Sequence, residues 1–103
     1  MKMDLEITRT AIEEFEECIK YVEKNFSSKK AMDFVLKMEH TFNLICKNPT
    51  AFPLSDYQDI RYVVVIKSIT VFYTINNEKT VQVVNIWNNR KDKNESKIKK
   101  MNY

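Results

Sequence analysis

Two arginines flank the apolar second half of the chain, and they are the residues best suited to chemistry on an anion. Arg61 opens a run of β-branched and aromatic residues, and Arg90 follows the last run of this kind. A guanidinium is permanently charged and donates hydrogen bonds in a fork that matches phosphate. The sequence therefore predicts cationic side chains at the rim of a small sheet, with Arg61 and Arg90 as the candidate catalytic residues.

Other kinds of catalytic site find little support in the sequence. The only histidine, His40, lies off the apolar stripe of its predicted helix and is expected on the solvated surface. The chain has no glycine, which excludes the glycine-rich loops that cradle phosphates and dinucleotides. Cys18 and Cys46 lack metal-ligand spacing and lie on apolar helical faces, so we expect buried free thiols. Neither a metal site nor a cofactor is predicted.

The basic charge is concentrated at one end of the chain. A length of 103 residues predicts one domain over residues 1–103. The net charge is +3, but residues 90–103 hold six basic and two acidic residues, and the rest hold 11 basic and 12 acidic. Residues 91–103 therefore form a basic C-terminal tail, which favours an anionic partner, either nucleic acid or an acidic protein.

The sequence shows no sign of a membrane or of secretion. No apolar run approaches the roughly 20 residues that cross a bilayer. The start of the chain is polar and lacks the apolar region of a signal peptide. We therefore expect a cytoplasmic protein without a membrane partner.

The first half of the chain has the pattern of a strand followed by two helices. Apolar and charged residues alternate over Lys2–Ile7, which is typical of a half-buried strand. The first helix follows a cap at Thr8 or Thr10, and the second ends at Asn48-Pro49, because the residue before proline avoids the helical region. Spacings of three and four give each helix an apolar stripe. The stripes are Ile12, Phe15, Ile19, Val22 and Phe26, and Ala31, Val35, Met38, Phe42 and Ile45.

Three more strands are predicted in the second half, over Ile60–Ile66, Ile69–Ile75 and Thr80–Trp87. The connections between them are short, which favours an antiparallel meander. The predicted fold class is therefore α+β, with an N-terminal strand, an antiparallel helical hairpin and a three-stranded antiparallel meander. The helices are expected to pack on one face of the sheet.

These last three strands are apolar on both faces. One helical hairpin covers one face, and a contiguous exposed apolar patch usually marks an interaction surface. We therefore expect a partner protein to pack on the second face. Alternation assigns Val63, Val65, Phe72, Val84 and Ile86 to one face, opposite Tyr62, Val64, Val71, Tyr73 and Val83. The candidate partner-binding residues are Val63, Val65, Phe72, Val84, Ile86, Trp87 and Lys91.

Purely structural roles are open for some of these residues. Arg61 can form an ion pair with Asp56 or Asp59 at the rim of the sheet, and Arg90 can do so with the aspartate two positions on. For Trp87, packing in the core or at an edge is favoured over a stacking platform, because no second aromatic residue lies near it in sequence.

The order of elements resembles the RelE/ParE superfamily of toxins, of the plasmid-stabilisation type, from type II toxin–antitoxin systems. The segments that carry the resemblance are Asn48-Pro49, Phe52-Pro53, Ile60-Arg61, Val71–Ile75 and Val84–Asp92. The resemblance covers essentially the whole chain. It implies a small cytoplasmic toxin that a cognate antitoxin holds inactive in a hetero-oligomer.

The resemblance implies one of two targets. The RelE-like branch cleaves mRNA on the ribosome with several cationic side chains and a tyrosine, whereas the ParE-like branch inhibits DNA gyrase without being a nuclease. This chain keeps Arg61 and Arg90 at matching positions. The other nuclease positions hold Val63, Thr70 and Ser96. We therefore expect a ParE-like toxin that binds gyrase. The alternatives are a ribosome-dependent mRNA endoribonuclease and an inactive binding module on the same fold.

Overall fold

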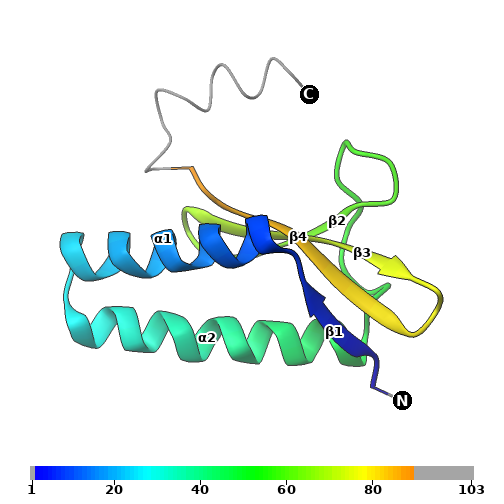
Figure 1. Ribbon diagram of the computed structural model, residues 1–103, viewed down its shortest axis with the longest axis horizontal. Coiled ribbons are helices and arrows are strands. Elements are labelled where there is room, and N and C mark those ends of the chain that lie inside the picture. Colours follow the sequence, from blue (N-terminus) through cyan, green and yellow to red (C-terminus); the bar gives the residue numbers. More distant parts are fainter. Residues whose placement is uncertain (1, 90–103) are drawn as a thin grey trace.

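The computed structural model describes residues 2–89, which form two helices and four strands (Figure 1). The elements are β1 (Asp4–Ile7), α1 (Arg9–Asn25), α2 (Ser28–Lys47), β2 (Arg61–Ile66), β3 (Ile69–Asn76) and β4 (Thr80–Asn88). The predicted α+β class and the predicted order of elements are confirmed. The strand boundaries differ from the predicted ones by one or two residues.

Both helices begin at side-chain caps. The hydroxyl of Thr8 accepts a hydrogen bond from the Ala11 N–H at 3.1 Å, so Thr8 caps α1. The hydroxyl of Ser27 does the same for α2, with the Lys30 N–H at 3.0 Å. The second helix stops at Lys47, directly before Asn48-Pro49, as predicted.

The buried face of α1 is rotated from the predicted stripe. Of the stripe, Val22 is buried but Ile12 and Phe26 are 45% and 58% exposed, whereas Ala11 and Cys18, outside the stripe, are buried. Small side chains at Ala11 and Cys18 let the helix approach β4 closely, which leaves the larger Ile12 at the surface. Both cysteines are buried, as predicted, and neither forms a disulfide within residues 2–89. Burial is also the main cause that raises the pKa of the Cys46 thiol, which keeps it protonated and unreactive.

The four strands form one sheet in the order β1-β4-β3-β2. The predicted antiparallel meander of β2, β3 and β4 is confirmed. The N-terminal strand β1 joins the sheet beside β4 and runs parallel to it, with Asp4 opposite Thr80. A parallel pair needs a long crossover, and here the helical hairpin together with β2 and β3 separates β1 from β4 along the chain. The edges of the sheet are therefore β1 and β2.

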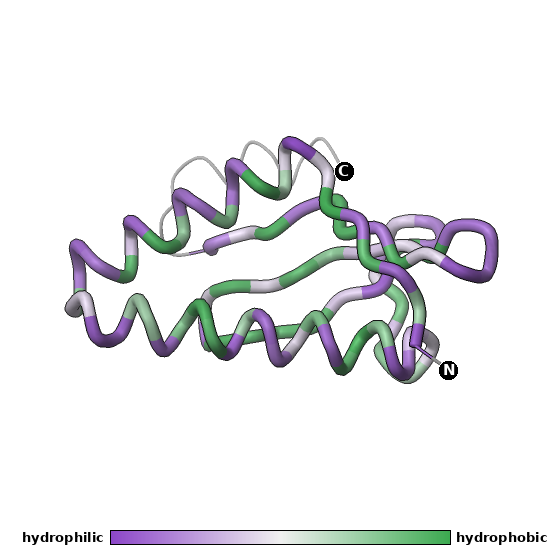
Figure 2. The backbone as a smooth tube through the Cα atoms, turned by 60° about the horizontal axis from the view of Figure 1, so that its bottom comes forward, coloured by the Kyte–Doolittle hydropathy of each residue, from purple (hydrophilic) through white to green (hydrophobic). Residues whose placement is uncertain are grey.

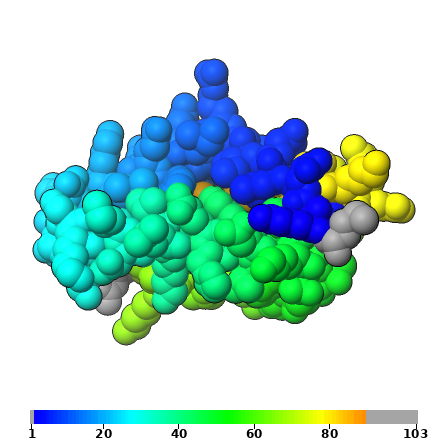
Figure 3. All heavy atoms as spheres, turned by 90° about the horizontal axis from the view of Figure 1, so that it is seen from below, coloured from blue at the N-terminus to red at the C-terminus, as the bar shows by residue number. Residues whose placement is uncertain are grey.

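The helices cover one face of the sheet, as predicted. Figure 3 shows this side, where α1 and α2 hide most of the strands. In Figure 2 the apolar stretches of the strands run alongside the two helices. The core between the layers includes Met38, Phe42 and Ile45 from α2, all predicted from the stripe.

The predicted division of the strand residues between the two faces was wrong. Val65 and Ile86, expected on the partner-binding face, are 5% and 1% exposed. They lie beneath the helices together with Val71, Tyr73 and Val83. Residues paired across neighbouring strands share a face, and the register pairs Val71 with Ile86. The alternation of apolar residues within one strand does not reveal which residues are paired between strands.

A bulge in β4 also determines which strand residues face the helices. The register of β3 and β4 shifts between Phe72 and Tyr73, because Phe72 pairs with Asn85 and Tyr73 pairs with Val83. The extra residue on β4 is Val84. Strict alternation would place Val83 and Ile86 on opposite faces, and the bulge places both in the core.

The connection between α2 and β2, residues 48–60, is tied to the sheet by side chains. We call it the proline loop. The hydroxyl of Tyr73 donates to the Pro49 carbonyl at 2.6 Å, and that of Thr74 donates to the Asp59 carbonyl at 2.9 Å. Asp59 has a φ of 62°, which an aspartate tolerates better than most residues. The loop is therefore anchored near both of its ends.

A core truncation on α2 should cost far more stability than a truncation on its outer side. Phe42 is 7% exposed and packs edge-on against Phe15, with ring centroids 6.3 Å apart. We expect Phe42→Ala to lower the free energy of unfolding by roughly 3–5 kcal/mol. Met32, on the same helix, is 67% exposed, and Met32→Ala should change it by less than about 0.5 kcal/mol. Urea titration of both variants measures the difference, and equal losses would contradict the assigned core.

Alkaline pH should unfold the protein partly through Tyr73. Burial raises the pKa of Tyr73 to about 12, and the charge of Arg61 opposes the shift only in part. The unfolded chain loses this proton near pH 10. Tyr73 therefore contributes fully below pH 10, and its contribution falls by about 2–3 kcal/mol as pH rises from 10 to 12. Urea titrations over this range should show a steeper decline for the native chain than for Tyr73→Phe. Parallel declines would show that Tyr73 does not titrate differently on folding.

Candidate functional site

Arg61 lies at the start of β2 and points toward the proline loop. Its Nη1 donates to the Phe52 carbonyl at 2.6 Å and to the Thr50 carbonyl at 3.4 Å. The ion pair with Asp56 or Asp59 that the sequence left open is not formed, since the one salt bridge within residues 2–89 joins two residues of α2. Arg61 thus holds the proline loop through hydrogen bonds to its backbone carbonyls.

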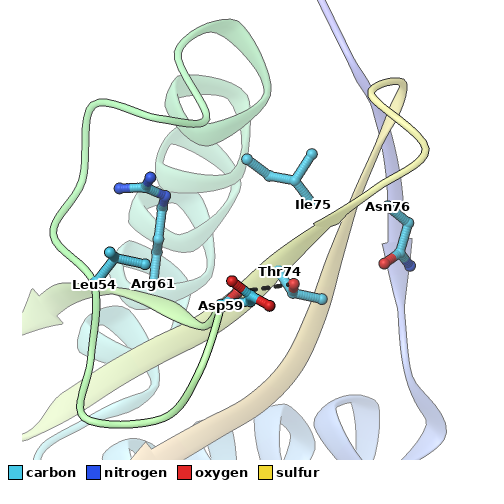
Figure 4. Close-up of a pocket in the computed structure, with 6 residues that line it drawn as sticks. All are labelled: Leu54, Asp59, Arg61, Thr74, Ile75 and Asn76. Atoms are coloured by element: carbon cyan, nitrogen blue, oxygen red, sulfur yellow. Dashed lines mark hydrogen bonds between the residues drawn. The ribbon is translucent and has the colours of Figure 1, made fainter.

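A cavity of about 360 Å³ borders the Arg61 side chain (Figure 4). Its lining residues are Leu54, Asp59, Arg61, Thr74, Ile75 and Asn76. Within it, the guanidinium of Arg61 supplies positive charge and the carboxylate of Asp59 supplies negative charge. No histidine lines it, and His40 is exposed on α2. The cavity can hold a polar group, but among residues 2–89 its lining offers a nuclease only one cation.

The structure does not bring the two ends of the meander together. Arg61 and Ile66 mark opposite ends of β2, about 17 Å apart at the usual rise of a strand. At the end of β4, Asn88 pairs with Ile69, and the Asn89 N–H donates to the Ser68 carbonyl at 2.8 Å. The described chain therefore ends beside the β2–β3 turn, away from Arg61. Arg90 itself lies outside the described residues, as do Lys91, Ser96 and the rest of the basic tail.

The other positions expected in a nuclease lie on different faces. Val63 pairs with Val71 and packs against the core, whereas Thr70 is half-buried and pairs with Trp87. Neither side chain is cationic. Within residues 2–89, the cationic set expected around one phosphate is reduced to Arg61.

The face of the sheet away from the helices carries a row of aromatic side chains. The rings of Tyr62 and Phe72 lie 6.4 Å apart, and those of Phe72 and Trp87 lie 6.1 Å apart in an edge-on contact. All three side chains are half-buried. We call them the aromatic row. No second aromatic residue lies near Trp87 in sequence, and its ring neighbour Phe72 comes from the adjacent strand β3. The register between strands, rather than nearness in sequence, identifies the members of the aromatic row.

The candidate partner-binding residues are divided by this arrangement. Phe72 and Trp87 belong to the aromatic row, and Val84 is half-buried at the bulge on β4. Val63, Val65 and Ile86 pack in or against the core on the helical side. Lys91 lies outside the described residues. Leu54 and Val64 were not in the predicted set, yet they are 58% and 56% exposed beside the row.

The described part of the chain has neither a metal-binding cluster nor a helix suited to a membrane. No group of three or more His, Cys, Asp or Glu residues within residues 2–89 is placed to hold a metal ion. Neither described helix combines the length and the apolar character that crossing a bilayer requires.

Comparison with known structures identifies the fold. The chain resembles one from the "Chromosomal ParDE TA system from P. aeruginosa" with a TM-score of 0.73 and 17% identity, covering 84% of this chain and 96% of that one. It resembles a chain of the E. coli DinJ-YafQ toxin-antitoxin complex with a TM-score of 0.56 and 14% identity, covering 87% and 96%. The YoeB dimer from Staphylococcus aureus gives 0.56 and 13%, covering 82% and 94%. At these identities the similarity shows the fold alone.

Comparison of sequences adds the family. No curated protein is significantly similar to the chain. The model of one family, described as "ParE toxin of type II toxin-antitoxin system, parDE", matches residues 5–93, which is most of the chain and every described helix and strand but the first residue of β1. The chain therefore belongs to the ParE toxin family of type II toxin–antitoxin systems.

Proposed function

We propose that this toxin inhibits growth by binding DNA gyrase, and that a cognate antitoxin neutralises it by forming a hetero-oligomer with it. The observation that carries the choice of target is the use of Arg61. A ribonuclease must neutralise a phosphate in its transition state, and preorganised cations do most of this work. Arg61 instead donates to two loop carbonyls, and the chain has Val63 and Thr70 where further cations would be expected.

The proposal of a neutralising partner is supported by the surface beside the aromatic row. Leu54 and Val64 expose more than half of their side chains there, next to Tyr62 and Phe72. An exposed apolar surface of this kind usually marks a binding site. We infer that the antitoxin covers it, with Phe72, Trp87, Val84 and Lys91 among its contacts. A structural relative is described as a toxin–antitoxin complex.

A second candidate function is a ribosome-dependent mRNA endoribonuclease. The observation that favours it is the cavity that Arg61 lines, where the described hydrogen bonds of the guanidinium involve Nη1. A loss of the loop contacts on binding RNA would free Arg61 for phosphate. In this reading Arg61 and Arg90 are the catalytic cations.

Induced expression in bacteria separates these functions. Cells are pulse-labelled for DNA, RNA and protein synthesis after induction, because gyrase inhibition stops DNA synthesis first, with a DNA-damage response. A ribosome-dependent nuclease stops protein synthesis first, with cleaved mRNA, and that order of events would overturn the gyrase proposal. Unimpaired growth would contradict both candidates and leave an inactive binding module. Co-expression of a small protein encoded beside the gene should restore growth if it is the antitoxin.

Removing Arg90 should reduce toxicity without unfolding the chain. The sequence predicts that Arg90 is a surface charge at the rim of the sheet, and such a charge contributes at most about 1 kcal/mol to stability. We therefore expect Arg90→Ala to relieve growth inhibition, and its free energy of unfolding to lie within about 1 kcal/mol of that of the native chain. Growth after induction and urea titration are measured together, with Lys93→Ala as the matched control in the same basic segment. A destabilisation as large as that of Phe42→Ala would show that Arg90 is structural.

A further inference from the structure

The two edge strands of the sheet differ in how they are protected against pairing with another chain. The edge strand β1 has four residues and exposes Asp4 and Glu6. Short, charged edges discourage the addition of a further strand. The other edge strand, β2, has no charge between Arg61 and Lys67 and consists of one aromatic and four β-branched residues over 62–66. The sheet is therefore open to pairing on the β2 side.

The proline loop covers only the first part of the β2 edge. Leu54 forms a bridge with Arg61, in which the Ser55 N–H donates to the Ile60 carbonyl at 2.7 Å and the Tyr62 N–H donates to the Pro53 carbonyl at 3.1 Å. Backbone groups in a strand point alternately to its two sides, so the next outward pair belongs to Val64. Within residues 2–89, no backbone group bonds Val64 from this side.

A groove of about 350 Å³ lies beside this open position. Its lining residues are Leu54, Ser55, Asp56, Tyr57, Tyr62, Val64, Thr70 and Phe72. One wall is the proline loop, which Tyr73 and Arg61 hold in place through hydrogen bonds to Pro49 and Phe52. The floor is the outer face of β2 and β3. The groove is therefore formed in the free chain, and its lining mixes apolar and aromatic side chains with Ser55, Asp56 and Thr70.

We propose that the β2 edge and this groove bind an extended segment of a partner protein. The segment adds a strand to the sheet by pairing with the outward N–H and C=O of Val64, and it places one apolar side chain against Leu54 and Tyr57. Strand addition takes its affinity from backbone hydrogen bonds and its selectivity from side-chain pockets. The identity of the partner as the antitoxin rests on the proposed function, whereas the mode of binding does not.

Charge favours such a segment over a second copy of this chain. Antiparallel pairing of two β2 edges centred on Val64 would set Arg61 of each copy opposite Lys67 of the other, and like charges in that position destabilise a sheet. The groove has Asp56 at one end, and β2 leads to the exposed Lys67 at the other. A segment with a basic residue at one end and an acidic residue at the other matches both, in a single direction.

Backbone NMR on the full chain tests the proposal with a defined probe. The probe is a short synthetic peptide that alternates threonine with valine and leucine and carries one glutamate and one lysine at opposite ends. On adding it, we expect the Val64 amide to become protected from hydrogen exchange, with shifts confined to β2 and residues 54–57. Shifts that map to α1 or to the end of β4 instead would overturn the proposal. Concentration-dependent protection of Val64 without peptide would show that a second copy is the occupant, and would overturn it as well.

Variants at Val64 separate edge pairing from simple apolar contact. Val64→Pro removes the outward N–H, and an edge strand tolerates proline where that group faces solvent. We expect it to weaken peptide binding by more than about tenfold, whereas Val64→Thr keeps the backbone and should bind within a few-fold. If Val64→Pro does not fold, Val64→Lys serves as the blocking variant, because lysine protects natural edges. Equal binding by a folded blocking variant and by Val64→Thr would contradict strand addition.

The same variants distinguish a failure of this proposal from a failure of the proposed function. If the chain inhibits growth, and the antitoxin restores growth equally well against the Val64→Pro and Val64→Thr variants, strand addition at the β2 edge is refuted and the toxin activity stands. If the chain does not inhibit growth, but the peptide protects the Val64 amide, the toxin activity is refuted and strand addition at the β2 edge stands.

Discussion

The register of β3 against β4 is the constraint on which the rest of the structure depends. It pairs Val71 with Ile86 and, after the bulge at Val84, pairs Tyr73 with Val83, so that all four paired side chains face the helices. The same register leaves Phe72, Thr70 and Trp87 on the outer face. The core and the outer face are thus set by one run of backbone hydrogen bonds. A shift by one residue would exchange them.

The register of β2 against β3 determines what Arg61 does. Because Tyr73 is paired with Arg61 and points into the helical side, its hydroxyl reaches Pro49, and the guanidinium of Arg61 reaches Phe52 in the same loop. Two neighbouring side chains therefore hold the proline loop against the sheet. A cation in that position holds the loop rather than a phosphate, which fits the proposed toxin that acts by binding better than one that cleaves RNA.

Much of the fold followed from local pattern, and the outer face did not. The stripe of α2, the stop at Asn48-Pro49 and the meander depend on neighbours in sequence, and all were predicted correctly. The division of Val65, Val71 and Ile86 between faces depends on pairing between strands and on a bulge, which no periodicity within one strand reveals. The aromatic row was missed for the same reason. Arg61 was a candidate site residue from the sequence, but its carbonyl partners come from an irregular loop whose path the sequence does not specify.

The parallel pairing of β1 with β4 has a consequence for synthesis of the protein. Asp4 pairs with Thr80, so the first strand has no partner in the sheet until nearly the whole chain has left the ribosome. The helical hairpin has local contacts and can form early, whereas the sheet is closed by its most distant contact, which is slow to form. During that interval the strand surfaces that later become core and edge are open to another chain. A partner synthesised nearby can therefore engage this protein before its fold is complete, and a shortened chain lacking β4 leaves β1 without its place in the sheet.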